Sequence, residues 1–72
     1  MSRTIHAEMV ASVHSVAVAV GESIDAGATL VVLESMKMEI PVLAEASGTV
    51  LEVLVAVGDV VQEGDALVSL SS

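Results

Sequence analysis

The sequence predicts an all-β domain in which two similar sheets form a sandwich or a flattened barrel. Hydrophobic residues make up 54% of the chain and none of them is aromatic, so the core consists of aliphatic side chains and methionine, a composition that favours β structure. Short apolar runs alternate with turn signals at close spacing, and no stretch has helical periodicity. The chain also repeats itself, which suggests two sheets related by a pseudo-two-fold axis.

The repeat covers most of the chain. Residues 7–34 align with residues 44–71 without a gap, at an offset of 37 residues, and twelve of the 28 aligned pairs are identical. The identical pairs include two glycine pairs, Gly21/Gly58 and Gly27/Gly64. Self-similarity at a fixed offset indicates a repeated structural unit. We therefore expect residues 1–72 to form a single domain with two equivalent halves.

Each half predicts the same order of elements. Valines alternate over residues 16–20 and again over 53–57, and a period of two places them on one face of a strand. A motif Gly-acid-x-(Ile/Val)-x-x-Gly follows, whose glycines suit turns with positive φ and whose Ile24 or Val61 is expected to point inward. A second strand, 29–33 or 66–70, completes each half. Pro41 belongs on an edge strand or at the start of a strand, because it cannot donate to a ladder.

The centre of the chain predicts a tight turn that lacks the residues usual for such a turn. The stretch 34–39 lies between two aliphatic runs, 30–33 and 40–43, which predict a hairpin with Met36 and Lys37 at its tip. Two-residue hairpin turns usually contain Asn-Gly or Gly-Gly, and a tip without glycine indicates a functional demand. Lys37 is the only lysine in the chain. The position equivalent to Lys37 in the other half is 37 − 37 = 0, which is the point where the two chain ends meet. The pseudo-two-fold axis should place equivalent positions at opposite ends of the domain. We therefore expect the hairpin to project from the end opposite the termini.

The composition excludes several functions. A net charge of −8 and the lack of aromatic residues exclude nucleic-acid binding and disfavour anionic membranes. No apolar run approaches the length of a transmembrane helix, which is about 20 residues. There is no cysteine for a disulfide or a thiolate metal site, and the N-terminal residues do not have the pattern of a signal peptide. We expect a cytoplasmic protein.

The central motif resembles that of a known family. Glu34-Ser35-Met36-Lys37-Met38 is similar to the Glu-Ala-Met-Lys-Met signature of biotinyl domains, the biotin carboxyl carrier family. The segments 7–13 and 44–50 and the four turn glycines extend the resemblance over nearly the whole chain. It implies two antiparallel four-stranded sheets, the single hybrid motif of biotinyl and lipoyl domains, with biotin attached covalently to the amine of Lys37. The gapless repeat leaves no room for the thumb insertion of some members, so we expect a small free-standing, thumbless protein.

The sequence departs from the family pattern at four positions. Ser35 replaces an alanine, Ala11 replaces a glycine, and Glu8 and Glu45 replace two prolines. None of these changes affects Met36, Lys37 or Met38. They therefore bear on details of the fold rather than on the expected modification.

The resemblance implies a carrier rather than an enzyme. A biotin protein ligase would acylate Lys37, with Met36, Met38 and Glu34 as recognition residues. The biotin arm would then carry CO2 between a biotin carboxylase and a carboxyltransferase, and the protein is expected to be a monomer. No catalytic constellation is present in the sequence, and His6 and His14 lack the spacing of metal ligands.

Simpler interpretations compete with these. Lys37 could be a solubilising hairpin lysine, Met38 could pack on the strand ends, and Glu34 and Glu39 could form a solvated acidic face. A lipoyl domain shares the fold and the lysine hairpin, but usually has Asp before the lysine and Ala or Val after it. A third alternative is an interaction module whose lysine is never acylated.

Overall fold

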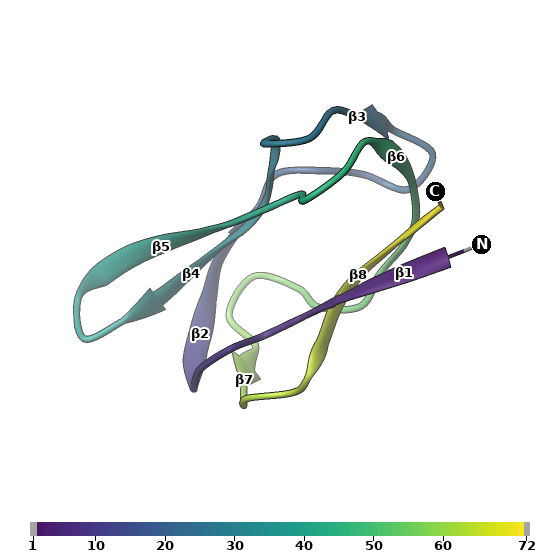
Figure 1. The fold of residues 1–72 in the computed structure, drawn as a ribbon. Coiled ribbons are helices and arrows are strands. Elements are labelled where there is room, and N and C mark those ends of the chain that lie inside the picture. The colour runs from purple at the N-terminus through teal and green to yellow at the C-terminus, as the bar shows by residue number, and fades with distance from the viewer. Residues whose placement is uncertain (1, 72) are drawn as a thin grey trace.

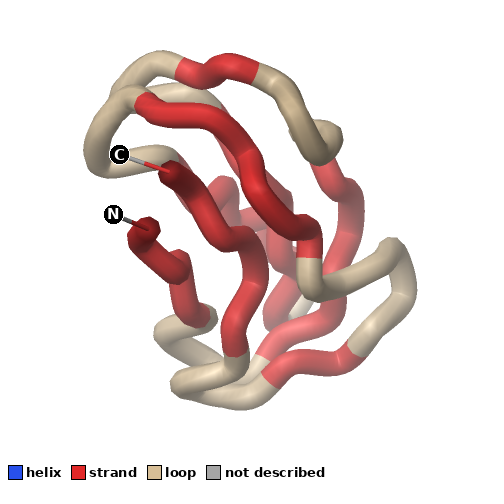
Figure 2. The backbone as a smooth tube through the Cα atoms, turned by 90° about the vertical axis from the view of Figure 1, so that its right-hand side faces the viewer, coloured by secondary structure: helices blue, strands red, loops and turns tan. Residues whose placement is uncertain are grey.

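The computed structural model describes residues 2–71, which form eight strands and no helix (Figures 1 and 2). The strands are β1 (Ser2–His6), β2 (Ala11–Val16), β3 (Ser23–Ile24), β4 (Thr29–Ser35), β5 (Met38–Leu43), β6 (Gly48–Val53), β7 (Val60–Val61) and β8 (Ala66–Ser71). All strand pairs are antiparallel. No helix in this part of the chain is long and apolar enough to cross a membrane.

The strands form two four-stranded sheets that exchange under the repeat offset. One sheet has the order β1-β8-β6-β3 and the other the order β5-β4-β2-β7. A shift of 37 residues converts the first order into the second: it is added for β1 and β3, which become β5 and β7, and subtracted for β8 and β6, which become β4 and β2. The predicted all-β architecture with pseudo-two-fold symmetry is therefore confirmed. Pro41 lies on the edge strand β5, where the missing N–H is tolerated.

Hydrogen bonds between the halves follow the same symmetry. The Gly27 N–H donates to the Ala44 carbonyl and the Gly64 N–H donates to the Ala7 carbonyl, each at 2.8 Å. The register shifts repeat as well, between Val13 and Ser15 in β2 and at the equivalent positions in β6. Each half therefore satisfies backbone hydrogen bonds at the turns of the other.

The core lies between the two sheets and consists of small and branched aliphatic side chains. Leu30, Val31, Leu67 and Val68 are fully buried. The rest of the core is Ala7, Ala11, Val13, Ile24, Leu33, Ala44, Val50, Val61 and Leu70. The inward orientation expected for Ile24 and Val61 is confirmed, because both are buried between the paired turn glycines.

The alternating valines are not continuous strands, so this prediction was wrong. β2 ends at Val16 and β6 ends at Val53, while Val20 and Val57 are each 66% exposed. After each strand the chain crosses from one sheet to the other, as the hydrogen bond from the Gly21 N–H to the Val50 carbonyl shows. A segment that crosses to the other sheet loses its hydrogen bonds to the neighbours of the strand it leaves, so the strand ends there even though the valines continue to alternate.

The two ends of the molecule differ as the repeat requires. The molecule is elongated, with extents of 33 × 18 × 17 Å. Ser2 pairs with Ser71 at one end, and the β4–β5 hairpin projects from the other (Figure 1). The prediction that the lysine hairpin lies opposite the termini is confirmed.

Candidate functional site: the lysine hairpin

Lys37 occupies a tight two-residue turn between β4 and β5. Ser35 pairs with Met38, so only Met36 and Lys37 connect the strands. Their φ angles are 53° and 65°, and positive φ at both central residues defines a type I′ turn, whose twist matches that of the flanking strands. The backbone therefore adopts the turn that Asn-Gly would favour, although the sequence offers two residues with side chains that disfavour it.

The tip of the hairpin is fully open to solvent. Met36 is 91% exposed and Met38 is 65% exposed, while Lys37 between them is also exposed. Lys37 forms no salt bridge with any of residues 2–71. Packing of Met38 on the strand ends accounts for the smaller part of its surface. An apolar pair thus flanks one free amine at the extreme end of the molecule.

Carboxylates lie one step back from the tip. Glu34 pairs with Glu39 across the hairpin, and both side chains are exposed. The His14 Nε2 lies 3.9 Å from the Glu39 Oε2, with both side chains largely in solvent. The backbone of Glu34 accepts a weak hydrogen bond from the Ser12 hydroxyl at 3.4 Å. The backbone pairing of β4 with β2 reaches as far as Ser12 and Glu34, so beyond this point β4 pairs only with β5.

Outside the hairpin, the residues considered as candidates are the histidines and the carboxylates. His6 lies exposed on β1, and no group of three or more His, Asp or Glu side chains within residues 2–71 could hold a metal ion. Several carboxylates stabilise turns in addition to being solvated. Oxygen atoms of Glu22 and Asp59 accept hydrogen bonds from the backbone N–H of Ala19 and Ala56, at 3.0 and 2.8 Å.

One feature of the structure was missed by the sequence reasoning. Glu8 and Glu45 line one groove beside the hairpin base, although the sequence marked them only as departures from a family pattern. The signal that could have paired them is the repeat itself, since 45 − 8 equals the offset of 37.

Together the fold and the hairpin define a class of protein: a small β domain with one exposed lysine at the tip of a projecting hairpin. Comparison with known families agrees with this class. The family model described as "Biotin-requiring enzyme", the biotin/lipoyl model, matches residues 3–70. The chain therefore belongs to the biotin/lipoyl family of biotin-requiring enzymes, as a biotinyl-type domain.

Two curated relatives illustrate the range of similarity. The chain is 56% identical over 50 residues to a Mycobacterium leprae protein named biotinylated protein TB7.3 homolog, a match that covers 69% of this chain and 70% of that one. It is 45% identical over 69 residues to the biotin/lipoyl attachment protein of Bacillus subtilis, covering 96% of this chain and 94% of the relative. The chain spans 62% to 70% of the length of the mycobacterial relatives that it matches.

Solved structures with the same fold include domains of much larger enzymes. A single-chain, multi-domain long-chain acyl-CoA carboxylase superposes with a TM-score of 0.91 and 37% identity, over 97% of this chain and 7% of the carboxylase. The lipoyl domain of the 2-oxoglutarate dehydrogenase complex from Azotobacter vinelandii superposes with a TM-score of 0.76 and 30% identity, over 88% of this chain and 80% of that domain. The chain is thus a biotin-requiring domain that resembles the biotinyl domains of carboxylases.

Proposed function

We propose that this protein is a biotin carrier, acylated on the Lys37 amine by a biotin protein ligase. In this proposal it transfers CO2 between the biotin carboxylase and carboxyltransferase sites of a biotin-dependent carboxylase. The observation that carries the proposal is the position of Lys37, exposed and without an ion-pair partner in residues 2–71, at the tip of the hairpin. The relatives named as biotinylated and the similarity to an acyl-CoA carboxylase support it.

The geometry of the hairpin fits covalent attachment of biotin. An acyl transfer to lysine requires an amine that a second protein can surround, and a lysine packed on its own sheet could not be reached. After losing a proton, the amine attacks the biotin carboxyl that the ligase has activated with ATP. The amide bond forms as the bond to the departing AMP breaks, and the positive charge of the ammonium group is lost. Bound biotin supplies the ureido group that accepts and releases CO2. The protein itself contributes the attachment point, its projection and the separation of the arm from the domain body.

Met36 and Met38 fit the role of recognition residues. Most of the surface of both methionine side chains makes no contact with the domain, and flexible thioethers adapt well to a partner surface. We assign Glu34 the role of an accessory contact, because it lies one pleat behind the tip and is exposed. Its pairing with Glu39 concentrates negative charge there, which favours a ligase surface that is basic at this point.

The domain functions as a tether rather than as a catalyst. A cofactor held on a mobile arm is present at each partner site at a high effective concentration, which a free cofactor could not reach. The structure supports this role through the distance between the hairpin and the chain ends, which lie at opposite ends of a molecule 33 Å long. Partners can thus approach the tip without meeting the termini.

The lipoyl alternative rests on the same fold, since the Azotobacter vinelandii domain superposes well. The exposed methionines on both sides of Lys37 favour biotin, because their resemblance is to the biotinyl signature. An interaction module without any acylation remains the second alternative. It predicts that Lys37 is dispensable.

The test is acylation by a purified biotin protein ligase with ATP and biotin. We expect the intact mass of the folded protein to rise by one biotinyl group, and streptavidin to detect the product. Lys37→Arg keeps the positive charge but should abolish labelling, while the thermal unfolding midpoint should not change because the side chain has no packing role. A protein isolated from its own cells with a lipoyl mass, or unmodified, would contradict the proposal.

A further inference from the structure

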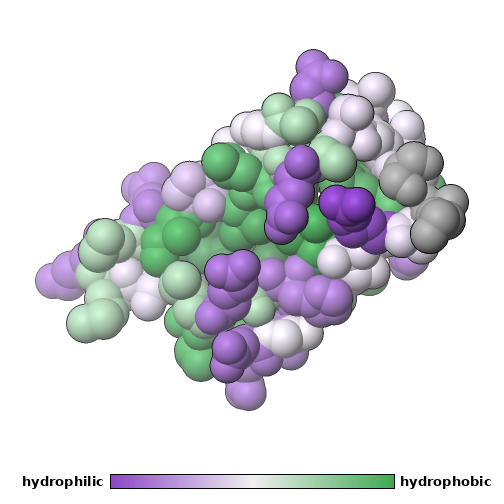
Figure 3. All heavy atoms as spheres, in the orientation of Figure 1, coloured by the Kyte–Doolittle hydropathy of each residue, from purple (hydrophilic) through white to green (hydrophobic). Residues whose placement is uncertain are grey.

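A groove runs along one side of the molecule between the edge strands β1 and β5. Its volume is about 390 Å3, within the range of about 300–1,000 Å3 that is usual for ligand sites. Leu33, Ile5, Met9 and Val42 supply an apolar floor that is continuous with the core. The space-filling view shows apolar residues gathered across the middle of this face, with polar residues around them (Figure 3).

The groove lies on the pseudo-two-fold axis. Most of its lining consists of repeat-equivalent pairs: Arg3 and Ile40, Thr4 and Pro41, Ile5 and Val42, His6 and Leu43, Glu8 and Glu45. The backbones of the two walls are therefore equivalent, whereas their side chains differ. The four residues that β5 contributes are apolar, and Glu45 follows them at the end of that wall, whereas the β1 wall includes charged and polar residues along its length.

Both walls are free strand edges. β1 pairs only with β8, and β5 pairs only with β4. Four consecutive residues from each strand line the groove, and since successive side chains alternate, the backbone edge itself must border it. Unpaired edge groups are a template for an added strand. Pro41 removes one donor from β5, whereas its equivalent Thr4 keeps its N–H, so β1 is the better edge for strand addition.

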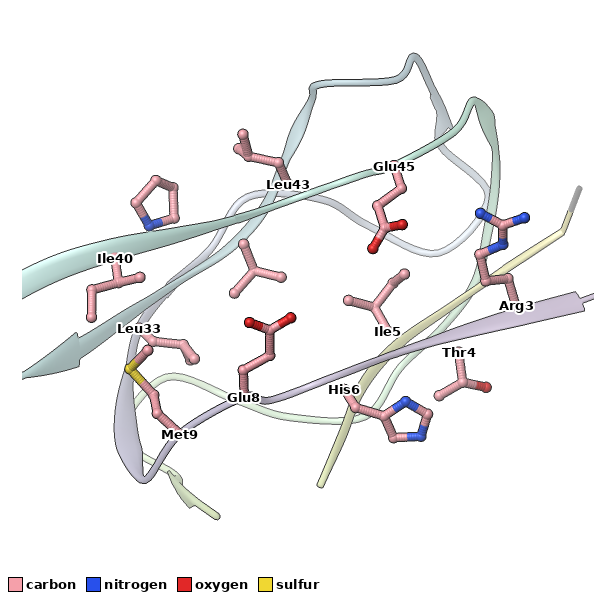
Figure 4. Close-up of a pocket in the computed structure, with 12 residues that line it drawn as sticks. Arg3, Thr4, Ile5, His6, Glu8, Met9, Leu33, Ile40, Leu43 and Glu45 are labelled. Carbon is pink, nitrogen blue, oxygen red and sulfur yellow. The ribbon is translucent and has the colours of Figure 1, made fainter. Parts of the chain in front are cut away.

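The charges in the groove favour a cationic guest. The carboxylates of Glu8 and Glu45 point toward each other across the groove from opposite walls (Figure 4). Neither forms a salt bridge with any of residues 2–71. Arg3 also points into the groove at the end near the termini, while His6 points away from it (Figure 4). A guest cation between the two carboxylates would gain charge-assisted hydrogen bonds from both walls of the groove.

We propose that this groove binds an extended segment of a partner protein, added as a strand along β1. Aliphatic side chains of the segment cover Leu33 and Met9, and an arginine or lysine lies between Glu8 and Glu45. A second copy of this chain does not fit, because its charge of −8 repels the groove. The groove ends at the base of the hairpin, so a bound segment leaves Lys37 exposed at the tip. The proposal holds whether or not Lys37 is acylated.

Selection from a random heptapeptide library displayed on phage tests this, with the full-length protein as bait. We expect enrichment of peptides with one basic residue flanked by aliphatic residues. The enriched peptide, made synthetically, should shift the backbone amide resonances of residues 3–9 and 40–45. Glu8→Gln combined with Glu45→Gln should weaken its binding about tenfold, as expected for the loss of charge-assisted hydrogen bonds.

Glu52→Gln combined with Glu63→Gln is the matched control, because it removes the same charge from two exposed positions outside the groove. It should leave binding within about twofold of the unchanged protein, since exposed charges at a distance are screened by salt. Equal weakening by both double variants would overturn the proposal. So would a selection that yields no common sequence, or resonance shifts confined to the tip of the hairpin. Self-association in sedimentation would also overturn it. Ligase labelling of Lys37 should be unchanged in the groove variant, so failure here is distinct from failure of the carrier function.

Discussion

The hairpin tip and the glycine corners of this molecule both require positive φ, yet they solve the problem differently. Gly21, Gly27, Gly58 and Gly64 have φ between 89° and 94°. At the tip, φ is 53° for Met36 and 65° for Lys37. The left-handed region open to residues with a Cβ extends only from about +50° to +70°. The tip lies inside this region and the corners lie outside it.

This difference shows where the protein can carry function. A type I′ turn can be built from non-glycine residues at a cost of about 1–2 kcal/mol per residue. The corners offer no such choice, even though nothing lies within 4 Å of an added Cβ at any of the four. Functional side chains are therefore tolerated more readily at the hairpin turn than at the corners.

Gly48 differs from both the tip and the corners, and its substitution should destabilise the protein most. Gly48 has an ordinary φ, but an added Cβ would clash with the Ser71 carbonyl oxygen on the paired strand. We expect Gly48→Ala to destabilise the protein by about 3 kcal/mol, because only a shift of backbone could relieve the clash. Chemical denaturation measures this.

Ala11 provides the control for Gly48, since it occupies the equivalent position in the first half. Ala11→Gly should cost about 1 kcal/mol, the usual loss for a glycine within a strand. Equal effects of the two substitutions would show that the close approach at Gly48 is not rigid.

The corners themselves should give the next largest effect. Gly58→Ala has open space around it, so its cost should come from backbone conformation alone, about 2 kcal/mol. Gly21→Ala, its repeat equivalent, should cost the same within about 0.5 kcal/mol, because the two corners make equivalent hydrogen bonds. Thermal unfolding detects such changes, since about 1 kcal/mol shifts the midpoint of so small a domain by about 4–8 °C. If Gly58→Ala did not change the stability, the corners would tolerate a Cβ as readily as the hairpin tip does.

A substitution at the hairpin tip should change the stability least, and should increase it. Met36→Asn places a residue that tolerates the left-handed region at the first turn position, and should stabilise the protein by about 0.5 kcal/mol. The same variant should be labelled more slowly by the ligase, because it lacks the apolar contact. Met38→Asn is the control, since Met38 lies in a strand and should gain no stability. A loss of stability in Met36→Asn would mean that the turn is held by contacts of the methionine.

The success of the sequence reasoning differed between elements. Local patterns and the constant repeat offset predicted the hairpin, the inward Ile24 and Val61, and the position of the termini. These predictions depend only on the order of residues along the chain, which is the same before and after folding. The strand ends at Val16 and Val53 were not predicted, because valines continue to alternate where the chain crosses between sheets. Periodicity describes one strand and holds no information on when it leaves its sheet.

The amino-acid sequence by itself determined the two equivalent halves, their turn glycines and the placement of a single lysine at a two-residue turn. These features depend on residue type and on spacing along the chain. Tertiary structure alone decided that Gly48 meets the Ser71 carbonyl, and that Glu8 and Glu45 face one another across an apolar groove. Such relations are distances between residues on different strands, and they exist only once both sheets have packed.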